Sequence, residues 1–168
     1  IDAFARMNLS PPEQLPVAQA REQFLRGRAG FIAAEEAVAG ATDTSFPGPG
    51  GPIPVRIYRP LGSAPADVLP VLMFFHGGGW VFGNLDSHDR LCRSLANRAR
   101  CCVIAVDYRL APEHRFPAAV DDAIAAIEHA ATQAAQLRID PKRIAAAGDS
   151  AGVDGPRVTK RTCQPRSA

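Results

Sequence analysis

Three short strand-like segments separated by helical patterns constrain the fold of this chain more than any other feature. Residues 68–75 and 102–106 are nearly continuous apolar runs, as expected of strands buried on both faces, and residues 143–147 predict a third short strand. Between the first two, Leu91 and Leu95 lie at helical spacing within residues 88–99. This order predicts an α/β fold whose parallel strands bind ligands at their carboxyl ends.

A second helical pattern begins at Pro117, a residue type that suits the first turn of a helix. Its apolar residues recur at i, i+4, i+7 and i+11, which predicts an amphipathic helix. The predicted buried face consists of Val120, Ile124, Ile127 and Ala131.

The region before the first buried strand has a different pattern. Apolar residues alternate with others through residues 53–59, and a turn rich in Pro and Gly at 47–54 separates them from residues 41–46, which predicts a β-hairpin. Residues 1–40 look helical and rather polar, with Ser10 as the expected N-cap. An interrupted apolar face is formed there by Phe24, Leu25, Phe31, Ile32 and Val38.

Two glycine-rich motifs follow the first and third buried strands. Residues 76–80 read HGGGW, and residues 148–152 read GDSAG. A serine on a tight strand-to-helix turn exposes its Oγ as a nucleophile, and backbone N–H groups beside it and on a glycine loop can bind the oxyanion of an acyl-transfer intermediate. The pair of motifs therefore predicts hydrolysis of an acyl ester.

Composition excludes several other classes of function. A net charge of +2 with scattered basic residues argues against binding to nucleic acid, and no apolar run approaches the roughly 20 residues that span a bilayer. The first six residues lack the order of a secretory signal, so we expect a cytoplasmic protein. The cysteines form no C-x-x-C pattern, which argues against a zinc site or a disulfide framework; they are Cys92, Cys101, Cys102 and Cys163.

Three segments resemble a known family. Residues 74–80 (FFHGGGW), 107–118 (DYRLAPEHRFPA) and 148–152 are similar to the hormone-sensitive-lipase family of α/β-hydrolases, in particular its bacterial esterase branch, and the turn at 47–54 is similar too. The resemblance extends from about residue 1 to Gly152. It implies the N-terminal part of an α/β-hydrolase fold, with a mostly parallel sheet and a helical N-terminal cap segment. It also implies a small-molecule carboxylic ester substrate with a short or medium acyl chain, and no cofactor or metal.

The resemblance assigns roles to the residues of the two motifs. Ser150 is the expected nucleophile, and the expected oxyanion hole consists of Gly77, Gly78 and Ala151. The supporting residues are His76, Gly79 and Asp149, with His76 orienting the glycine loop by hydrogen bonding rather than acting as the base. Four residues are expected to brace the loop after the second buried strand: Asp107, Tyr108, Arg109 and Glu113. Trp80 and Phe82 either line an acyl pocket or pack against their neighbours.

The sequence departs from the family pattern after Gly152. The triad of this fold runs from Ser to an acid and then to His, yet the four histidines, His76, His88, His114 and His129, all precede Ser150. Asp154 is the single acid after the serine, and it follows too closely to reach a later histidine. We expect a frameshift or truncation near codon 153. The chain then has three predicted parts: a helical cap segment (1–40), the N-terminal part of the hydrolase core (41–152) and a disordered tail outside the family (153–168). The strand at 143–147 would then lie exposed at the sheet edge.

Three interpretations stay open on the sequence alone. The first is an incomplete serine esterase that is inactive as written. The second is a hydrolase-like module that binds an ester-like or acidic ligand without turnover, and the third is a non-functional frameshift product. Acyl and alcohol specificity and oligomeric state stay open as well.

Overall fold

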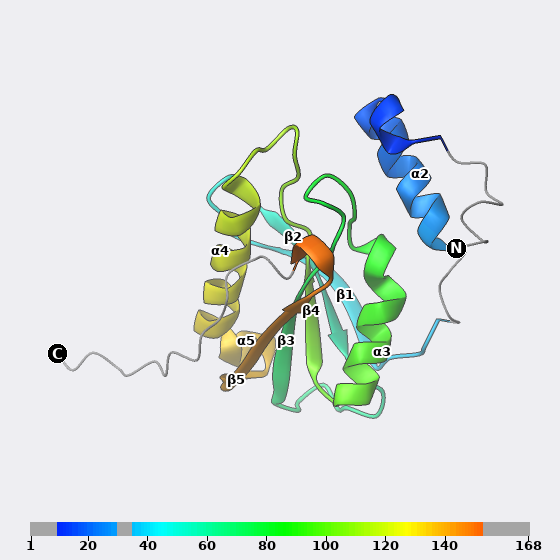
Figure 1. Cartoon of the computed structure of the whole chain (residues 1–168). Helices are drawn as coiled ribbons and strands as arrows, with labels where there is room; N and C mark the ends of the chain where they lie inside the picture. Colours follow the sequence, from blue (N-terminus) through cyan, green and yellow to red (C-terminus); the bar gives the residue numbers. More distant parts are fainter. Residues whose placement is uncertain (1–9, 30–34, 153–168) are drawn as a thin grey trace.

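A computed structural model describes residues 10–29 and 35–152, and it gathers the predicted strands into one five-stranded sheet (Figure 1). The strands are β1 (Gly40–Phe46), β2 (Ile53–Arg59), β3 (Leu69–Phe75), β4 (Cys102–Val106) and β5 (Ile139–Gly148). Their order across the sheet is β1-β2-β4-β3-β5. The predicted α/β fold and the predicted hairpin of β1 and β2 are both confirmed.

The sheet is mixed rather than mostly parallel. β3 pairs in parallel with β4 on one side and with β5 on the other, as predicted. The hairpin, however, joins the sheet through β2, which runs antiparallel to β4, so the pairs β1–β2 and β2–β4 are antiparallel. The two strands of a hairpin run in opposite directions, so β1 and β2 cannot both be parallel to β4.

Helices cover both faces of the sheet, which explains the continuous apolar runs of β3 and β4. Met73 and Phe75 of β3 belong to the core cluster under α4 (Ala118–Thr132) and the short helix α5 (Ala134–Leu137). Phe74, which points to the opposite face, belongs to the cluster under α3 (Asp89–Ala99). Burying a side chain of this size stabilises the fold by about 1.5–3 kcal/mol relative to leaving it exposed.

The buried face of α4 differs from the predicted one, and the predicted helix at α3 is confirmed. The buried row of α4 consists of Ala123, Ala126 and Ala130, whereas Ile124 is 41% exposed. In α3 the buried residues are Cys92 and Ala96; Leu95 packs against the same core cluster, and Leu91 is exposed. Small side chains let these helices approach the sheet closely, so the small residues face it and larger ones lie at the margins.

The N-terminal segment contains η1 (Pro12–Gln14) and the helix α2 (Val17–Ala29). Ser10 is not an N-cap: its backbone N–H donates to Gln23 Oε1, and Pro11 takes the cap position of η1 without a side-chain bond. Leu15 is extended because it precedes Pro16, so the chain makes a single 3-10 turn before α2 begins. Residues 35–39 form no helix, and Phe31 and Ile32 lie outside the described residues.

β5 forms one edge of the sheet, as predicted, and residues 145–147 of this strand are exposed. Among residues 10–29 and 35–152, no helix is long and apolar enough to cross a membrane. The predicted tail, residues 153–168, lies outside the described part of the chain.

Candidate active site

Strand pairing brings the two glycine-rich motifs together. β3 and β5 are parallel neighbours, and Phe75 at the end of β3 is paired with Gly148 at the end of β5. Both motifs therefore leave the sheet at the same carboxyl edge, although they lie far apart in the sequence. In Figure 1 this edge lies where β5 ends in the orange turn, at the opposite end of the strand from the label of β5.

Ser150 occupies the sharp turn expected of a nucleophile elbow. Its φ is +49°, a left-handed conformation that side-chain-bearing residues rarely adopt, and the residue is exposed. The turn is closed by a hydrogen bond of 2.9 Å from the Gly152 N–H to the Asp149 carbonyl oxygen. A Cβ on Gly152 would collide with the Phe75 carbonyl oxygen, so only glycine lets the turn lie this close to β3.

Several backbone N–H groups of the glycine loop and of this turn have no hydrogen-bond partner in the described part of the chain. They include the N–H groups of Gly78 and Gly79 on the loop and of Ala151 on the turn. Gly78 and Gly79 have φ of +133° and +61°, and the Gly78 carbonyl oxygen accepts bonds from the N–H groups of Val81 and Phe82. These unpaired donors are what an oxyanion hole requires.

The N–H of Gly77 is already occupied. It donates to Asp149 Oδ1 at 2.6 Å, so this bond links the glycine loop directly to the residue before Ser150. The sequence predicted Gly77 as a donor to the oxyanion, but its N–H is directed to the carboxylate instead. Burial raises the pKa of Asp149, but the bond from Gly77 and the interactions with His88 outweigh it, so the pKa lies below its ordinary value.

His88 completes this contact, and sequence reasoning gave it no role. Its Nε2 lies 3.2 Å from Asp149 Oδ1 and 3.3 Å from Oδ2, and its side chain is 1% exposed. Burial and the charge of Arg28 outweigh the opposing effect of Asp149 and lower the pKa of His88 to about 4, so the ring is neutral at pH 7. We call the set of Gly77, His88 and Asp149 the Asp149 junction.

His76 has the surroundings of an orienting residue. The ring is buried, stacks on Tyr108 with centroids 4.4 Å apart, and places Nδ1 3.1 Å from the Gly77 carbonyl oxygen. Its Nε2 faces Asp107 Oδ1 at 3.6 Å, beyond hydrogen-bond distance. Within the described residues Ser150 makes no hydrogen bond, so none of the four histidines is placed as its base.

The residues after β4 brace the site through contacts with other elements. The Tyr108 hydroxyl donates to the His76 carbonyl oxygen, and Arg109 pairs with the buried Asp122 of α4 at 2.8 Å. Glu113 pairs with Arg21 of α2 at 2.7 Å. Arg21 also donates to the carbonyl oxygens of Val81 and Ala111, which fixes α2 over both loops.

The two aromatic residues after the glycine loop have different surroundings. Phe82 stacks on Phe24 of α2 with centroids 5.5 Å apart, which is a packing role. Trp80 is 44% exposed and lines a small groove together with Ala151 and Gly152. Trp80 is thus the aromatic residue that lies next to the elbow.

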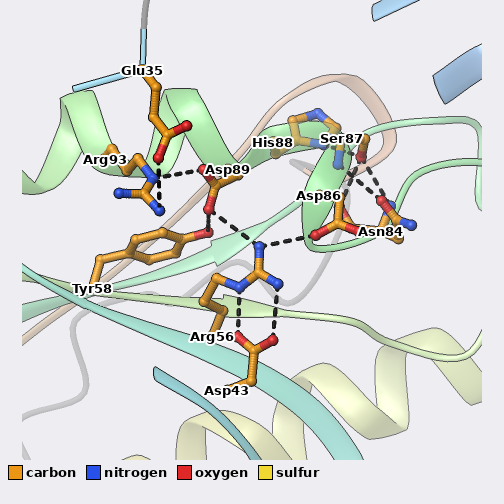
Figure 2. Close-up of polar contacts among 10 residues, drawn as sticks. All are labelled: Glu35, Asp43, Arg56, Tyr58, Asn84, Asp86, Ser87, His88, Asp89 and Arg93. Carbon is orange, nitrogen blue, oxygen red and sulfur yellow. Dashed lines mark hydrogen bonds and ion pairs between the residues drawn. The ribbon is translucent and has the colours of Figure 1, made fainter. Parts of the chain in front are cut away.

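A larger cleft of about 790 Å³ lies elsewhere, and none of the predicted site residues lines it. Its floor is a set of ion pairs that we call the Arg56 cluster, which consists of Asp43, Arg56, Asp86 and Asp89 (Figure 2). Arg56 holds Asp43 through two bonds of 2.5 and 2.9 Å, and this bonding lowers the pKa of the Asp43 carboxyl. The cluster joins β1 and β2 to the segment η2 (Asp86–His88).

Comparison with known proteins identifies the family. A family model described as alpha/beta hydrolase fold matches residues 72–154, which include both motifs. The chain belongs to this α/β-hydrolase family. The sequence-based prediction of the family and of the fold is thereby confirmed.

The similar proteins include ester hydrolases. The chain is 52% identical over 115 residues to the carboxylic ester hydrolase LipN of Mycobacterium tuberculosis, covering 66% of this chain and 29% of LipN. Among solved structures, it resembles an ester hydrolase from the metagenome of Lake Arreo, with a TM-score of 0.84, 46% identity and coverage of 90% of this chain and 48% of that one. It also resembles the hyperthermophilic esterase of the archaeon Pyrobaculum calidifontis, with a TM-score of 0.83, 42% identity and coverage of 90% and 47%. The chain thus spans about half the length of these structures or less.

Proposed function

We propose that this chain carries the nucleophile and the oxyanion hole of a carboxylic ester hydrolase. The observation that supports the proposal most strongly is the strained, exposed Ser150 on a turn that the bond from the Gly77 N–H to Asp149 joins to the glycine loop. Among residues 10–29 and 35–152, the N–H groups of Gly78 and Gly79 on that loop and of Ala151 on the turn have no hydrogen-bond partner. The ester hydrolase relatives support the same reaction class.

In this mechanism Ser150 Oγ attacks the carbonyl carbon of a small ester. The carbonyl oxygen becomes an oxyanion, and preorganised N–H donors stabilise it, each contributing about 3–4 kcal/mol in comparable sites. We assign this role to Ala151 and Gly78, as the sequence predicted, and to Gly79 in place of Gly77, because the N–H of Gly77 is bound to Asp149. Gly77, His76 and Asp149 then support the loop.

A serine hydroxyl needs a general base to become an efficient nucleophile. The described residues place no histidine against Ser150, so the proposal assigns the base to a group outside residues 10–29 and 35–152. Oxyanion stabilisation and binding alone leave roughly 10³–10⁴-fold acceleration over water when a triad is lost. We therefore expect little turnover from the 168-residue chain and a measurable, slow reaction of Ser150.

The test is labelling with a fluorophosphonate probe, followed by peptide mapping. We expect an adduct on Ser150 and no adduct in Ser150→Ala, with Ser94→Ala as the matched control because Ser94 lies on α3, away from both motifs. Absence of any adduct on Ser150 in the folded chain would contradict the proposal. If a phosphonate raises the melting temperature without forming an adduct, the second interpretation, a binding module, is favoured, and failure of both measurements favours an inert product.

A further inference from the structure

The buried imidazole of His88 lies beside the site, and the proposed reaction does not use it. It follows the loop after β3 and reaches across to Asp149 on the turn after β5. Sequence reasoning noted His88 only as a histidine that precedes Ser150. Its contacts account for why a histidine is buried at this position.

Those contacts fix which ring nitrogen carries the proton. An ionised Asp149 carboxylate can only accept hydrogen bonds, so the His88 Nε2 that faces it must carry a hydrogen. In a neutral ring Nδ1 is then an acceptor, and it lies 2.8 Å from Ser87 Oγ. His88 therefore donates to Asp149. Its Nδ1 competes with the Asn84 carbonyl oxygen for the single hydroxyl proton of Ser87.

The other end of the ring is held by a tight turn. Ser87 Oγ accepts the Asn84 N–H at 2.9 Å and lies 2.7 Å from the Asn84 carbonyl oxygen, while the Ser87 N–H donates to Asn84 Oδ1 (Figure 2). The Ser87 carbonyl oxygen accepts a bond of 2.9 Å from Arg28 Nε on α2. The imidazole is thus anchored on one side, and its Nε2 is aimed at the carboxylate on the other.

The carboxylate needs such a partner because its side chain is 41% exposed. A half-exposed carboxylate without a fixed donor is free to turn towards water and release the Gly77 N–H. The loop of three consecutive glycines would then gain conformational freedom, since glycine is the residue with the most backbone freedom to lose on folding. Holding Asp149 therefore holds the loop.

We propose that His88 is a positioning residue that keeps the Asp149 carboxylate on the Gly77 N–H and so fixes the glycine loop opposite Ser150. This inference rests on the proposed function, because the role of a fixed loop is to position the N–H groups of Gly78 and Gly79 for the oxyanion. The contact itself can be measured whether or not the chain hydrolyses esters. Failure of one proposal is therefore distinguishable from failure of the other.

The experiment follows the backbone amide of Gly77 by NMR in the 168-residue chain at neutral pH. A short bond to a carboxylate moves this amide proton downfield and slows its exchange with water. In His88→Phe, which keeps a ring but loses the donor, we expect an upfield shift and exchange about 10-fold faster or more, as for loss of a charge-assisted hydrogen bond. In His88→Gln, whose amide can donate from about the position of Nε2, we expect the amide to return towards its wild-type shift.

His114→Phe is the matched control, because His114 is exposed and outside the Asp149 junction. In His114→Phe the Gly77 amide proton should keep its wild-type chemical shift. An unshifted Gly77 amide in folded His88→Phe would overturn the proposal, and so would equal losses in His88→Phe and His88→Gln, which would indicate packing alone. If His88→Phe loses the dispersed spectrum of a folded protein, His88→Gln decides: a wild-type Gly77 amide supports positioning, and a displaced or absent one overturns it.

Discussion

The Asp149 junction and the Arg56 cluster both tie the segment after β3 to distant parts of the chain, yet they differ in burial and charge. The junction uses a backbone N–H and a nearly inaccessible neutral imidazole. The Arg56 cluster uses ion pairs, and its Asp43 and Asp86 side chains are 60% and 74% exposed. Exposed ion pairs contribute little and are screened by salt, whereas a hydrogen bond from a buried donor to a partly buried carboxylate is screened less and holds a more defined geometry. The junction adjoins the proposed nucleophile Ser150, where geometry matters, and the residues of the cluster line the larger cleft.

The largest expected effect comes from separating the elbow from β3, which would break the Asp149 junction as a whole. We expect Gly152→Ala to lower the free energy of unfolding by about 3 kcal/mol or more, because the new Cβ would meet the Phe75 backbone. Urea denaturation measures the change. Gly40→Ala, where a Cβ meets nothing within 4 Å, should change stability by less than about 1 kcal/mol. Equal effects of the two substitutions would show that the close approach at Gly152 does not constrain the fold.

Acidification should weaken the junction before it affects the Arg56 cluster. The pKa of His88 falls from 6.5 to about 4 on folding, so between these pH values the unfolded chain binds the extra proton. Stability is therefore full above pH 6.5 and is lost as the pH falls towards 4, by at most about 3 kcal/mol. Asp149, whose pKa is also lowered, loses its own contribution at still lower pH.

Urea denaturation at a series of pH values between 4 and 7 measures this slope. Burial is the main cause of the lowered pKa of His88; of the groups around the ring, Arg28 of α2 and His76 lower this pKa further, and Asp149 raises it. His88→Gln removes the titrating group, so its stability should vary less over this range. If His88→Gln keeps the wild-type dependence of stability on pH, the acid sensitivity belongs to other groups.

A smaller effect is expected when the Arg56 cluster is broken. We expect Arg56→Met to cost about 1 kcal/mol, because Asp43 and Asp86 are solvated while Asp89 keeps its bonds from Tyr58 and Arg93. The cost should shrink when salt is raised to 1 M, where the Debye length is roughly 3 Å. The Gly77 amide should be unaffected. A loss that is independent of salt would mean that packing of the Arg56 stem, rather than its charge, holds the cluster.

The smallest effect is expected at an isolated surface pair. Arg26 and Glu22 of α2 form an i,i+4 pair at 2.8 Å, and both side chains are more than 60% exposed. Arg26→Ala should change the free energy of unfolding by about 0.3–0.5 kcal/mol. Thermal unfolding of Arg26→Ala and Arg56→Met in parallel measures the two changes. A loss of stability in Arg26→Ala larger than that in Arg56→Met would show that the stability of the whole fold depends on α2.

The sequence by itself determined the strands, the hairpin, the α/β class and the two motifs, because each of these follows from local patterns. Alternation gave the hairpin of β1 and β2, and continuous apolar runs gave β3 and β4. The motifs were recognisable because a nucleophile elbow needs its glycines at fixed spacing. The roles of Ser150, Gly78 and Ala151 remain predictions that the geometry supports.

Other features were decided by the tertiary structure. Periodicity could not tell which side of α4 faces the sheet. The helix packs closely on the sheet through the small side chains of Ala123 and Ala126, and Ile124 lies outside this contact. Nor could periodicity reveal that the Gly77 N–H is occupied or that the buried partner of Asp149 is His88. Those contacts join residues that only the parallel pairing of β3 and β5 brings to one edge, so no local pattern encodes them.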